Sequence, residues 1–382
     1  MEAGISKRLK WRAEALVHSG VAAVMRQLPA RSVFLIGEFL GKLIWPFMGR
    51  RRSIISRNLR IAAVSVDARK SFVRTVANLM CSSVSANLKG GDLGDLLEVE
   101  NPELLEEAFS KGKGVVLLLA HMGNWELLTR LHRSFPEGAR SGAFYRPLNN
   151  LILNERVLRE READGTRLFS KRDSLHHVSG FLRENGIIGI LADQRVGRQG
   201  ASVGFFGRLT RASPLPSLLV RRCRSEVLAL SLRTLAPGKW SARYHRVERP
   251  YSSANCMAAL ERAMHASPID VFWLQERWKV YLSKNNPPAK WIGDPDARGA
   301  KPHRVLVWAK ENEKDLPLSP SCLHGDFGYE MAIGKHPSEL SGIDAAEPLP
   351  IDFILVFSKN EGLRDSAKKL GIPVFRVSQF SE

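Results

Sequence analysis

The stretch that decides the fold is Gly114-Val-Val-Leu-Leu-Leu-Ala-His-Met-Gly-Asn-Trp-Glu126. A short apolar run that begins at a glycine and ends in polar residues is typical of a buried strand. After it come an imidazole at His121 and a helix opening at Asn124, so we predict a strand, a turn and a helix. Ligands of open α/β sheets bind beyond the carboxyl ends of the strands. The stretch therefore predicts a site at His121, with Glu126 as a carboxylate that orients the imidazole.

The spacing between His121 and Glu126 is not diagnostic by itself. Three of the 10 histidines have a carboxylate five residues later. The other two such pairs are His132 with Glu137 and His265 with Asp270. Only His121 follows a buried apolar run, because the other two pairs lie in stretches that contain a proline and follow no such strand. A hydrogen-bonded structural histidine at a strand end is the alternative for His121.

Composition and net charge limit the classes of protein to which the chain can belong. The chain has 382 residues, enough for two or three domains, and its 44% hydrophobic and 25% charged residues are ordinary for a folded protein. Its net charge of +18 indicates an acidic partner, such as nucleic acid, anionic lipid or an acidic protein. The four cysteines lie far apart and form no CxxC or Cys/His pair. We therefore predict no structural zinc site, no disulfide framework and a reducing compartment.

The N-terminal segment predicts membrane association. Residues 32–48 are rich in large apolar side chains, but they include Glu38 and Lys42 and are shorter than the roughly 20 residues of a spanning helix. Residues 15–25 could imitate the apolar core of a signal peptide, but Arg26-Gln-Leu-Pro29, which follows them, is no small-residue cleavage site. The arginines that come after residue 48 are Arg50, Arg51, Arg52, Arg57 and Arg60. An apolar helix face beside basic residues is typical of an anchor on anionic lipid, and an amphipathic core helix is the alternative.

The rest of the chain alternates expected helices and strands. The expected strands are 141–145, 165–169, 187–191, 227–232 and 241–245, and the expected helices are 67–88, 101–109, 151–163, 174–184 and 213–224. This alternation predicts an α/β fold with a central mixed sheet flanked by helices. We expect membrane-associating helices over 1–60, a catalytic domain over 61–284, a linker over 285–302 rich in Pro, Gly and Asp, and a small α/β domain over 303–382.

Five segments carry a resemblance to a known family. They are Ala120-His-Met-Gly-Asn-Trp-Glu126, Phe144-Tyr-Arg-Pro-Leu-Asn-Asn150, Gly189-Ile-Leu-Ala-Asp-Gln194, Gly204-Phe-Phe-Gly207 and Phe272-Trp-Leu-Gln-Glu-Arg-Trp-Lys279. In this order they resemble the bacterial lipid A biosynthesis acyltransferases, the lauroyl/myristoyl family. The resemblance implies a glycerol-3-phosphate-acyltransferase-like fold at the cytoplasmic face of the inner membrane. It also implies transfer of a fatty acyl chain from acyl carrier protein to a hydroxyl of a lipid A precursor or a similar phosphorylated glycolipid.

The chemistry of such a transfer suits His121. A hydroxyl that attacks a thioester must lose a proton, and a positioned imidazole is the usual general base. Glu126 can accept a hydrogen bond from the other ring nitrogen and stabilise the cation that forms, provided that Gly123 supplies a turn between the two. The carrier thioester is a co-substrate that is already activated, so we expect no covalent acyl-enzyme, no metal and no cofactor.

The resemblance also implies residues that bind substrate. They are Arg146, Arg161, Asp193, Gln194 and Asn124. Guanidinium groups suit phosphates on the acceptor lipid or on the pantetheine arm of the carrier, and Asp193 is expected to hold one of the two arginines. For most of the arginines on the 151–163 helix a solvated face is the alternative. Phe205 and Phe206 border a substrate groove or pack in the core, and Trp273, Arg277 and Trp278 are predicted to be structural.

Residues 303–382 faintly resemble the first half of a heptosyltransferase-type glycosyltransferase, through Arg304-Val-Leu-Val-Trp308 and Leu363-Arg-Asp-Ser-Ala-Lys-Lys-Leu-Gly-Ile-Pro373. The expected Gly-Asp motif after the first strand is replaced by Glu311-Asn-Glu-Lys-Asp315, and the chain stops before a second sugar-nucleotide domain. We therefore predict that this tail has no glycosyl transfer activity.

Other functions stay open. The acceptor could be a different lipid, such as a phosphatidylinositol mannoside or a lysolipid. A metal hydrolase could use His121, Glu126 and Asp193. Nucleic-acid binding is favoured only by the charge of +18, because the chain has no helix-turn-helix spacing, zinc pattern or ribonucleoprotein motif. The partners that we expect are acyl carrier protein, a phosphorylated glycolipid and an anionic membrane surface, and not nucleic acid.

Overall fold

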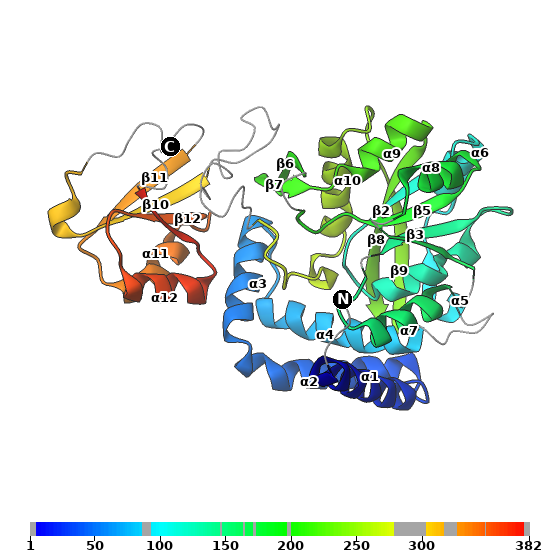
Figure 1. Cartoon of the computed structure of the whole chain (residues 1–382), viewed down its shortest axis with the longest axis horizontal. Coiled ribbons are helices and arrows are strands. Elements are labelled where there is room, and N and C mark those ends of the chain that lie inside the picture. The colour runs from blue at the N-terminus through cyan, green and yellow to red at the C-terminus, as the bar shows by residue number, and fades with distance from the viewer. Residues whose placement is uncertain are drawn as a thin grey trace. The chain divides into compact units, whose positions relative to one another are not determined.

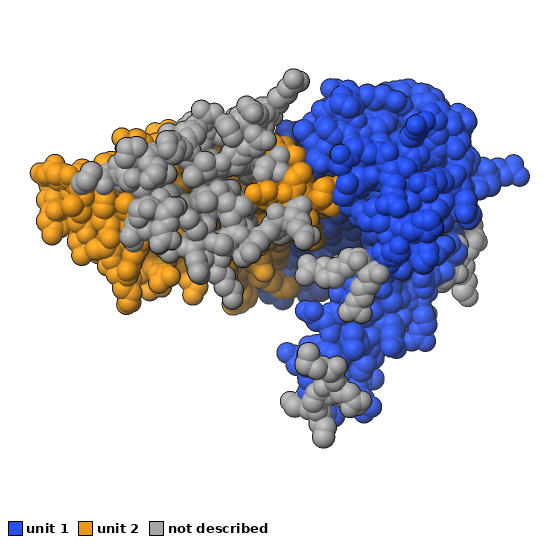
Figure 2. All heavy atoms as spheres, turned by 45° about the horizontal axis from the view of Figure 1, so that its top comes forward, with its two compact units in different colours: residues 1–43, 73–192, 215–272 blue, residues 44–72, 193–214, 273–382 orange. Residues whose placement is uncertain are grey.

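The computed structural model describes residues 5–85, 93–145, 147–162, 165–170, 173–196, 200–278, 303–316, 327–347 and 349–377. The chain divides into two compact units (Figure 2). Unit 1 comprises residues 1–43, 73–192 and 215–272, and unit 2 comprises residues 44–72, 193–214 and 273–382. Unit 2 thus combines the tail with two earlier stretches of the chain, whereas the sequence predicts the tail as a separate domain. The expected linker over 285–302 lies outside the described residues.

Unit 1 is built on a mixed seven-stranded sheet of order β1-β9-β8-β2-β5-β3-β4 (Figure 1). The strands are β1 (Leu97–Val99), β2 (Val115–Leu119), β3 (Ser141–Tyr145), β4 (Arg167–Ser170), β5 (Ile187–Leu191), β8 (Glu226–Ala236) and β9 (Lys239–Arg246). Strand β2 pairs in parallel with β5 on one side and β8 on the other, and all its residues are buried. Burial on both faces explains its unbroken apolar run. The predicted α/β class with a central mixed sheet is confirmed.

Helices flank this sheet as expected. They include α6 (Glu103–Ser110), α9 (Leu215–Cys223) and α10 (Ser253–His265), which pack on strands β2, β8 and β9, and α7 (Leu151–Glu162), which packs on β4. Helix α8 (Leu175–Arg183) packs on α9, and the short α5 (Leu93–Leu96) precedes β1. Serine is a favoured residue at the start of a helix, and two helices begin at one. The Ser174 side chain accepts from His176 N at the start of α8, and the Ser252 side chain accepts from Asn255 N at the start of α10.

The segment after the His121 turn is helical as predicted, but it is a 3-10 helix, η2 (Trp125–Ser134), and not an α-helix. In a 3-10 helix, side chains three residues apart lie in line. Trp125, Leu128 and Leu131 have that spacing, and all three line the same pocket. The tighter helix therefore presents a row of apolar side chains to the site.

The N-terminal helices expose apolar side chains. Glycines at the interface bring α2 (Ala30–Ile44) close to α4 (Ala68–Ser85), because a Cβ on Gly37 would lie 2.6 Å from the Cα of Ala77. The outer face of α2 exposes Leu35, Phe39 and Leu43. Helix α1 (Ile5–Met25) exposes Leu9, Leu16, Val17, Val21 and Val24. In the described part of the chain no single helix has the length and apolarity to cross a membrane, whereas the interrupted pair 30–47 and 49–61 meets both criteria together.

Unit 2 contains the expected small α/β tail. Its parallel sheet has the order β11-β10-β12-β13, with β10 (His303–Ala309), β11 (Phe327–Ile333), β12 (Phe353–Val356) and β13 (Val374–Arg376). Helices α11 (Leu340–Ala346) and α12 (Glu361–Leu370) belong to it, and Gly371 ends α12 at a φ of +74°. The rest of unit 2 includes the turn η1 (Trp45–Phe47), helix α3 (Gly49–Ile61) and the hairpin of β6 (Ala201–Phe205) and β7 (Arg208–Ala212).

Candidate active site

His121 lies two residues beyond the end of β2, at the turn into η2. Gly123 has a φ of +56° in this turn, and a Cβ there would lie 2.7 Å from the carbonyl oxygen of Leu232. Glycine is therefore required on two grounds, backbone conformation and space. The Gly123 N–H donates to the carbonyl of Asp270 at 2.9 Å, and the Phe272 N–H donates to the carbonyl of His121 at 2.8 Å. The backbone on both sides of the imidazole is thus held by residues 270–272.

Two aromatic rings surround the imidazole. The centroid of the His121 ring lies 5.2 Å from that of Trp125 in an edge-on arrangement and 6.4 Å from that of Phe272. Trp125 and Phe272 also contact each other edge-on, at 5.7 Å. Such edge-on contacts have a preferred geometry. His121 itself is only half-buried, so an oriented imidazole stays accessible to a substrate.

Glu126 is bound by Arg161 of α7 through both of its carboxylate oxygens. Arg161 Nη2 donates to Oε1 at 2.7 Å, and Nε donates to Oε2 at 3.1 Å. This two-point geometry is the strongest that an arginine and a carboxylate form. The structure thus brings together two of the expected site residues, 35 positions apart in the chain. Orientation of His121 by Glu126 stays a prediction.

An apolar pocket adjoins this ion pair. Strand β2 contributes Leu117 and Leu119, and its neighbour β5 contributes Gly189 and Leu191. Alternate residues of a strand face the same side of a sheet, so these four residues form one wall. The apolar row of η2 also lines the pocket, and strands β3 and β4 contribute residues that include Ala143, Phe144 and Leu168. Glu126 and Arg161 line the same pocket.

The ion pair also lines a second, more polar pocket. His18 and Arg26 of α1 and its following turn contribute to it, together with Glu160 of α7. Arg26 Nη2 donates to Glu160 Oε1 at 2.7 Å, which makes a second ion pair beside that of Glu126 and Arg161. An apolar space and a charged space therefore meet at the Glu126 carboxylate and the Arg161 guanidinium, and Glu126 follows the imidazole of His121 by five residues in the chain.

The other expected substrate-binding residues have different surroundings. Arg146 lies outside the described residues. Asn124 is 2% exposed and its side-chain amide donates to Ser85 Oγ at 2.8 Å, which suits support of the turn better than contact with a substrate. Gln194 is exposed, and it belongs to unit 2 with Asp193.

Asp193 pairs with Arg277, a partner that the sequence did not indicate. Arg277 Nη2 donates to Asp193 Oδ2 at 2.8 Å, and both side chains are almost fully buried. Phe205 and Phe206 are also buried and contact the rings of Trp273 and Trp278, which supports core packing and not a groove. The predicted structural role of Trp273, Arg277 and Trp278 agrees with this burial.

Asp270 supports the His121 turn, a role that the sequence did not indicate. Asp270 is 2% exposed and accepts hydrogen bonds from Thr234 N at 2.9 Å, Thr234 Oγ1 at 2.6 Å and Ser267 Oγ at 2.7 Å. Arg74 Nη1 lies 3.5 Å from its carboxylate. Ser267 is close to Asp270 in the chain, but Thr234 lies 36 positions away and Arg74 farther still, so no local pattern could have identified the cluster.

Two of the cysteines are poorly suited to nucleophilic catalysis. Burial raises the pKa of the Cys81 thiol to about 12, and it raises that of Cys256 to the same value. Both therefore stay protonated at neutral pH, and the thiolate is the nucleophilic form of cysteine. Within the described ranges, no group of three or more His, Cys, Asp or Glu residues is arranged to hold a metal ion.

Comparison with known proteins shows the family of the chain. The family model described as bacterial lipid A biosynthesis acyltransferase matches residues 6–280. The lipid A biosynthesis palmitoleoyltransferase of Escherichia coli is 22% identical over 283 residues, which span 68% of this chain and 89% of that protein. The phosphatidylinositol mannoside acyltransferase of Mycobacterium tuberculosis is 26% identical over 201 residues, which span 47% of this chain and only 60% of that protein. The model covers most of the chain, and the chain therefore belongs to the bacterial lipid A biosynthesis acyltransferase family of lipid acyltransferases.

Proposed function

We propose that the protein transfers a fatty acyl chain from acyl carrier protein to a hydroxyl of a phosphorylated glycolipid of the lipid A type. The observation that carries this proposal is the junction of an apolar pocket and a charged pocket at Glu126 and Arg161. The acyl chain binds in the apolar pocket, where each buried methylene contributes about 0.8 kcal/mol. Arg161 and Arg26 bind phosphate on the acceptor, since guanidinium groups bind phosphate in two-point geometry.

His121 is the general base of this reaction. Its imidazole takes the proton from the acceptor hydroxyl as the oxygen attacks the carbonyl carbon of the thioester. The carbon–sulfur bond then breaks, and the departing thiolate of the carrier takes up the proton from the imidazolium. The products are an ester and a free carrier thiol, so no acyl-enzyme forms. Trp125 and Phe272 hold the imidazole in place throughout.

The N-terminal helices bring the enzyme to the membrane that contains its acceptor. The exposed apolar side chains of α1 and α2 can insert at the lipid interface. Arg50, Arg51 and Arg52 are exposed at the start of α3 and supply positive charge. Association with the cytoplasmic face of the inner membrane is part of the proposal and follows from the family.

A second candidate acceptor is a phosphatidylinositol mannoside. Phosphatidylinositol mannoside acyltransferases of M. tuberculosis and Mycolicibacterium smegmatis are 26% and 29% identical to this chain over the matched residues. Both acceptors present a sugar hydroxyl near a phosphate, so the same base and the same arginines serve either of them. The shape of the acceptor-binding site then decides which of the two lipids is acylated.

A panel of acceptors tests the proposed function. The full-length protein is incubated with labelled acyl carrier protein and, separately, with a lipid A precursor, a phosphatidylinositol mannoside and a lysophospholipid, and labelled lipid is measured. We expect transfer to the lipid A precursor and release of free carrier thiol in equal amount. Faster transfer to the mannoside would assign the second candidate. No transfer to any lipid, together with salt-dependent binding of nucleic acid, would refute both candidates.

A larger side chain in the apolar pocket should shorten the preferred acyl chain. Ala143 of β3 lines this pocket, and Ala143→Leu fills part of the space that the acyl chain occupies. We expect the optimum to move to a chain shorter by about two to four carbons, because a filled cavity no longer accepts the same volume. The measurement is competition between carriers with C10 to C16 chains. Ala236→Leu, at the exposed end of β8, is the matched control and should leave the optimum unchanged.

A further inference from the structure

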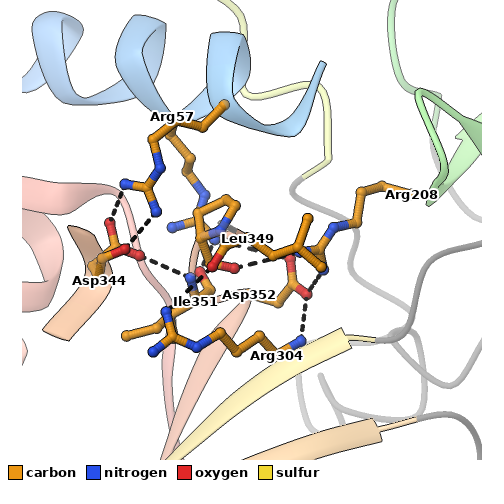
Figure 3. Close-up of polar contacts among 9 residues, drawn as sticks. Arg57, Arg208, Arg304, Asp344, Leu349, Ile351 and Asp352 are labelled. Carbon is orange, nitrogen blue, oxygen red and sulfur yellow. Dashed lines mark hydrogen bonds and ion pairs between the residues drawn. The ribbon is translucent and has the colours of Figure 1, made fainter. Parts of the chain in front are cut away.

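The tail carries two buried aspartates that pair with arginines from earlier parts of the chain (Figure 3). Asp352, just before β12, accepts a hydrogen bond from Nη1 of Arg208, the first residue of β7, and the two side chains are 2% and 1% exposed. Asp344 of α11 is 6% exposed and accepts from Nη1 of Arg60 in α3 at 3.3 Å. Nη2 of Arg57, also in α3, lies 4.0 Å from Asp352. The tail therefore supplies the counter-charges for α3 and β7.

Arg208 and Arg57 depend on the tail, because their side chains are 1% and 12% exposed and buried charges need partners. A buried charge that loses its partner is strongly destabilising, whereas a paired one is tolerated. Burial lowers the pKa of the Arg57 guanidinium, and Asp344 and Asp352 oppose that shift. Asp352 is itself fixed, since it accepts from the backbone N–H of Arg304 at 3.0 Å. The same carboxylate thus joins β10, an interior strand of the tail sheet, to the β6–β7 hairpin.

The hairpin in turn packs on the segment that holds Asp193. Thr210 Oγ1 of β7 donates to the carbonyl of Arg277 at 3.0 Å, and Trp278 Nε1 donates to the carbonyl of Phe205 in β6, also at 3.0 Å. Arg277 is the partner of Asp193. Contacts therefore run without interruption from Asp352 through the hairpin to Asp193, which follows β5 by two residues in the chain.

We propose that the tail is a positioning domain of the acyltransferase. Asp344 and Asp352 hold α3 and the β6–β7 hairpin in the arrangement that acyl transfer needs. The hairpin in turn holds the Arg277–Asp193 pair. Asp352 is a positioning residue and touches no substrate. This role differs from that of an independent sugar-nucleotide domain, because such a domain would need no buried ion pairs with the rest of the chain. Only the activity measurement in the test below rests on the proposed function.

The test compares two single variants of the full-length protein, Asp352→Asn and Asp365→Asn. Asp365 lies in α12 of the same tail and is exposed, so its variant is the matched control. Amide hydrogen exchange over residues 201–212 reports on the hairpin, and acyl transfer reports on function. We expect Asp352→Asn to speed amide exchange over residues 201–212 by at least about tenfold, because local opening frees the hairpin. We also expect kcat to fall while KM changes less. The control should change neither.

A double variant separates positioning from a simple need for charge. Arg208→Met with Asp352→Asn removes both charges of this pair, while the asparagine keeps a side-chain oxygen that can accept from the Arg304 N–H, and removal of both partners often restores a buried site. We expect it to recover slow exchange over 201–212 and most of the activity. Unchanged exchange in Asp352→Asn, or lost activity with unchanged exchange, would overturn the positioning role. Faster exchange in Asp352→Asn, with no acyl transfer by the wild-type protein, would support the positioning of the hairpin and refute the proposed function.

Discussion

Replacement of His121 by alanine is expected to lower the rate of acyl transfer by at least about two orders of magnitude, the usual scale for loss of a general base. The physical reason is that the acceptor hydroxyl must lose its proton as it attacks, and we propose that His121, at the turn after β2, is the base that takes it. The measurement is the initial rate with labelled acyl carrier protein under saturating acceptor. Thermal unfolding of the variant, followed in parallel, checks that the fold is intact.

His132→Ala is the matched control for this prediction. His132 has the same spacing to a carboxylate, but it lies in η2, where its Nδ1 is 3.1 Å from the carbonyl of Thr129. We expect His132→Ala to keep a near wild-type rate. Equal losses from the two histidine variants would contradict the assignment of His121 as the base, since a general effect of removing an imidazole would then explain both.

Replacement of Arg161 by methionine is expected to lower kcat/KM for a phosphorylated acceptor by roughly 100-fold. The reason is that the guanidinium would no longer donate two charge-assisted hydrogen bonds, of about 1.5 kcal/mol each, to the acceptor phosphate. Methionine keeps much of the length and apolar character of the side chain, so the change chiefly removes the guanidinium. Arg161→Lys should recover only part of the loss, since lysine keeps the charge but cannot form the two-point contact. The measurement is kcat/KM for the same acceptor with and without its phosphate.

Arg159→Met provides the control on the same helix. Arg159 is exposed, and its Nε donates to the carbonyl of Glu155, one turn earlier in α7, at 3.4 Å. We expect this variant to behave like the wild-type protein. If Arg161→Met lowered the rate equally for acceptors with and without phosphate, Arg161 would act by holding Glu126 and not by binding phosphate.

The strand and the turn at His121 could be predicted because they follow from local patterns. An unbroken apolar run marks a strand buried on both faces, and the glycine after His121 marks a backbone turn that other residues do not adopt. Strand β5 spans the predicted residues for the same reason. Strand β11 was not predicted, since Phe327-Gly-Tyr-Glu-Met-Ala-Ile333 mixes exposed and buried positions. The 3-10 form of η2 also has no local signature, because it differs from an α-helix by a small change in pitch.

Partner choice among charged residues could not be predicted. Asp193 pairs with Arg277, 84 positions later, and no local pattern indicated that partner. Arg146 lies outside the described residues, so contact between Asp193 and Arg146 stays a prediction. Arg208 likewise pairs with Asp352, 144 positions later in the chain. A charged side chain carries no information about which distant partner will neutralise it, because its own sequence neighbourhood sets only its exposure.

By itself, the sequence determined the α/β class, the buried strand that precedes His121 and the membership of a lipid acyltransferase family, since all three rest on residue types at short or regular spacing. Only the tertiary structure decided that Glu126 binds Arg161, that Asp270 supports the turn and that the tail shares a unit with α3 and the β6–β7 hairpin. The physical reason is that hydrophobic burial is encoded by local periodicity, whereas ion pairs in the core depend on which distant segments the topology brings together.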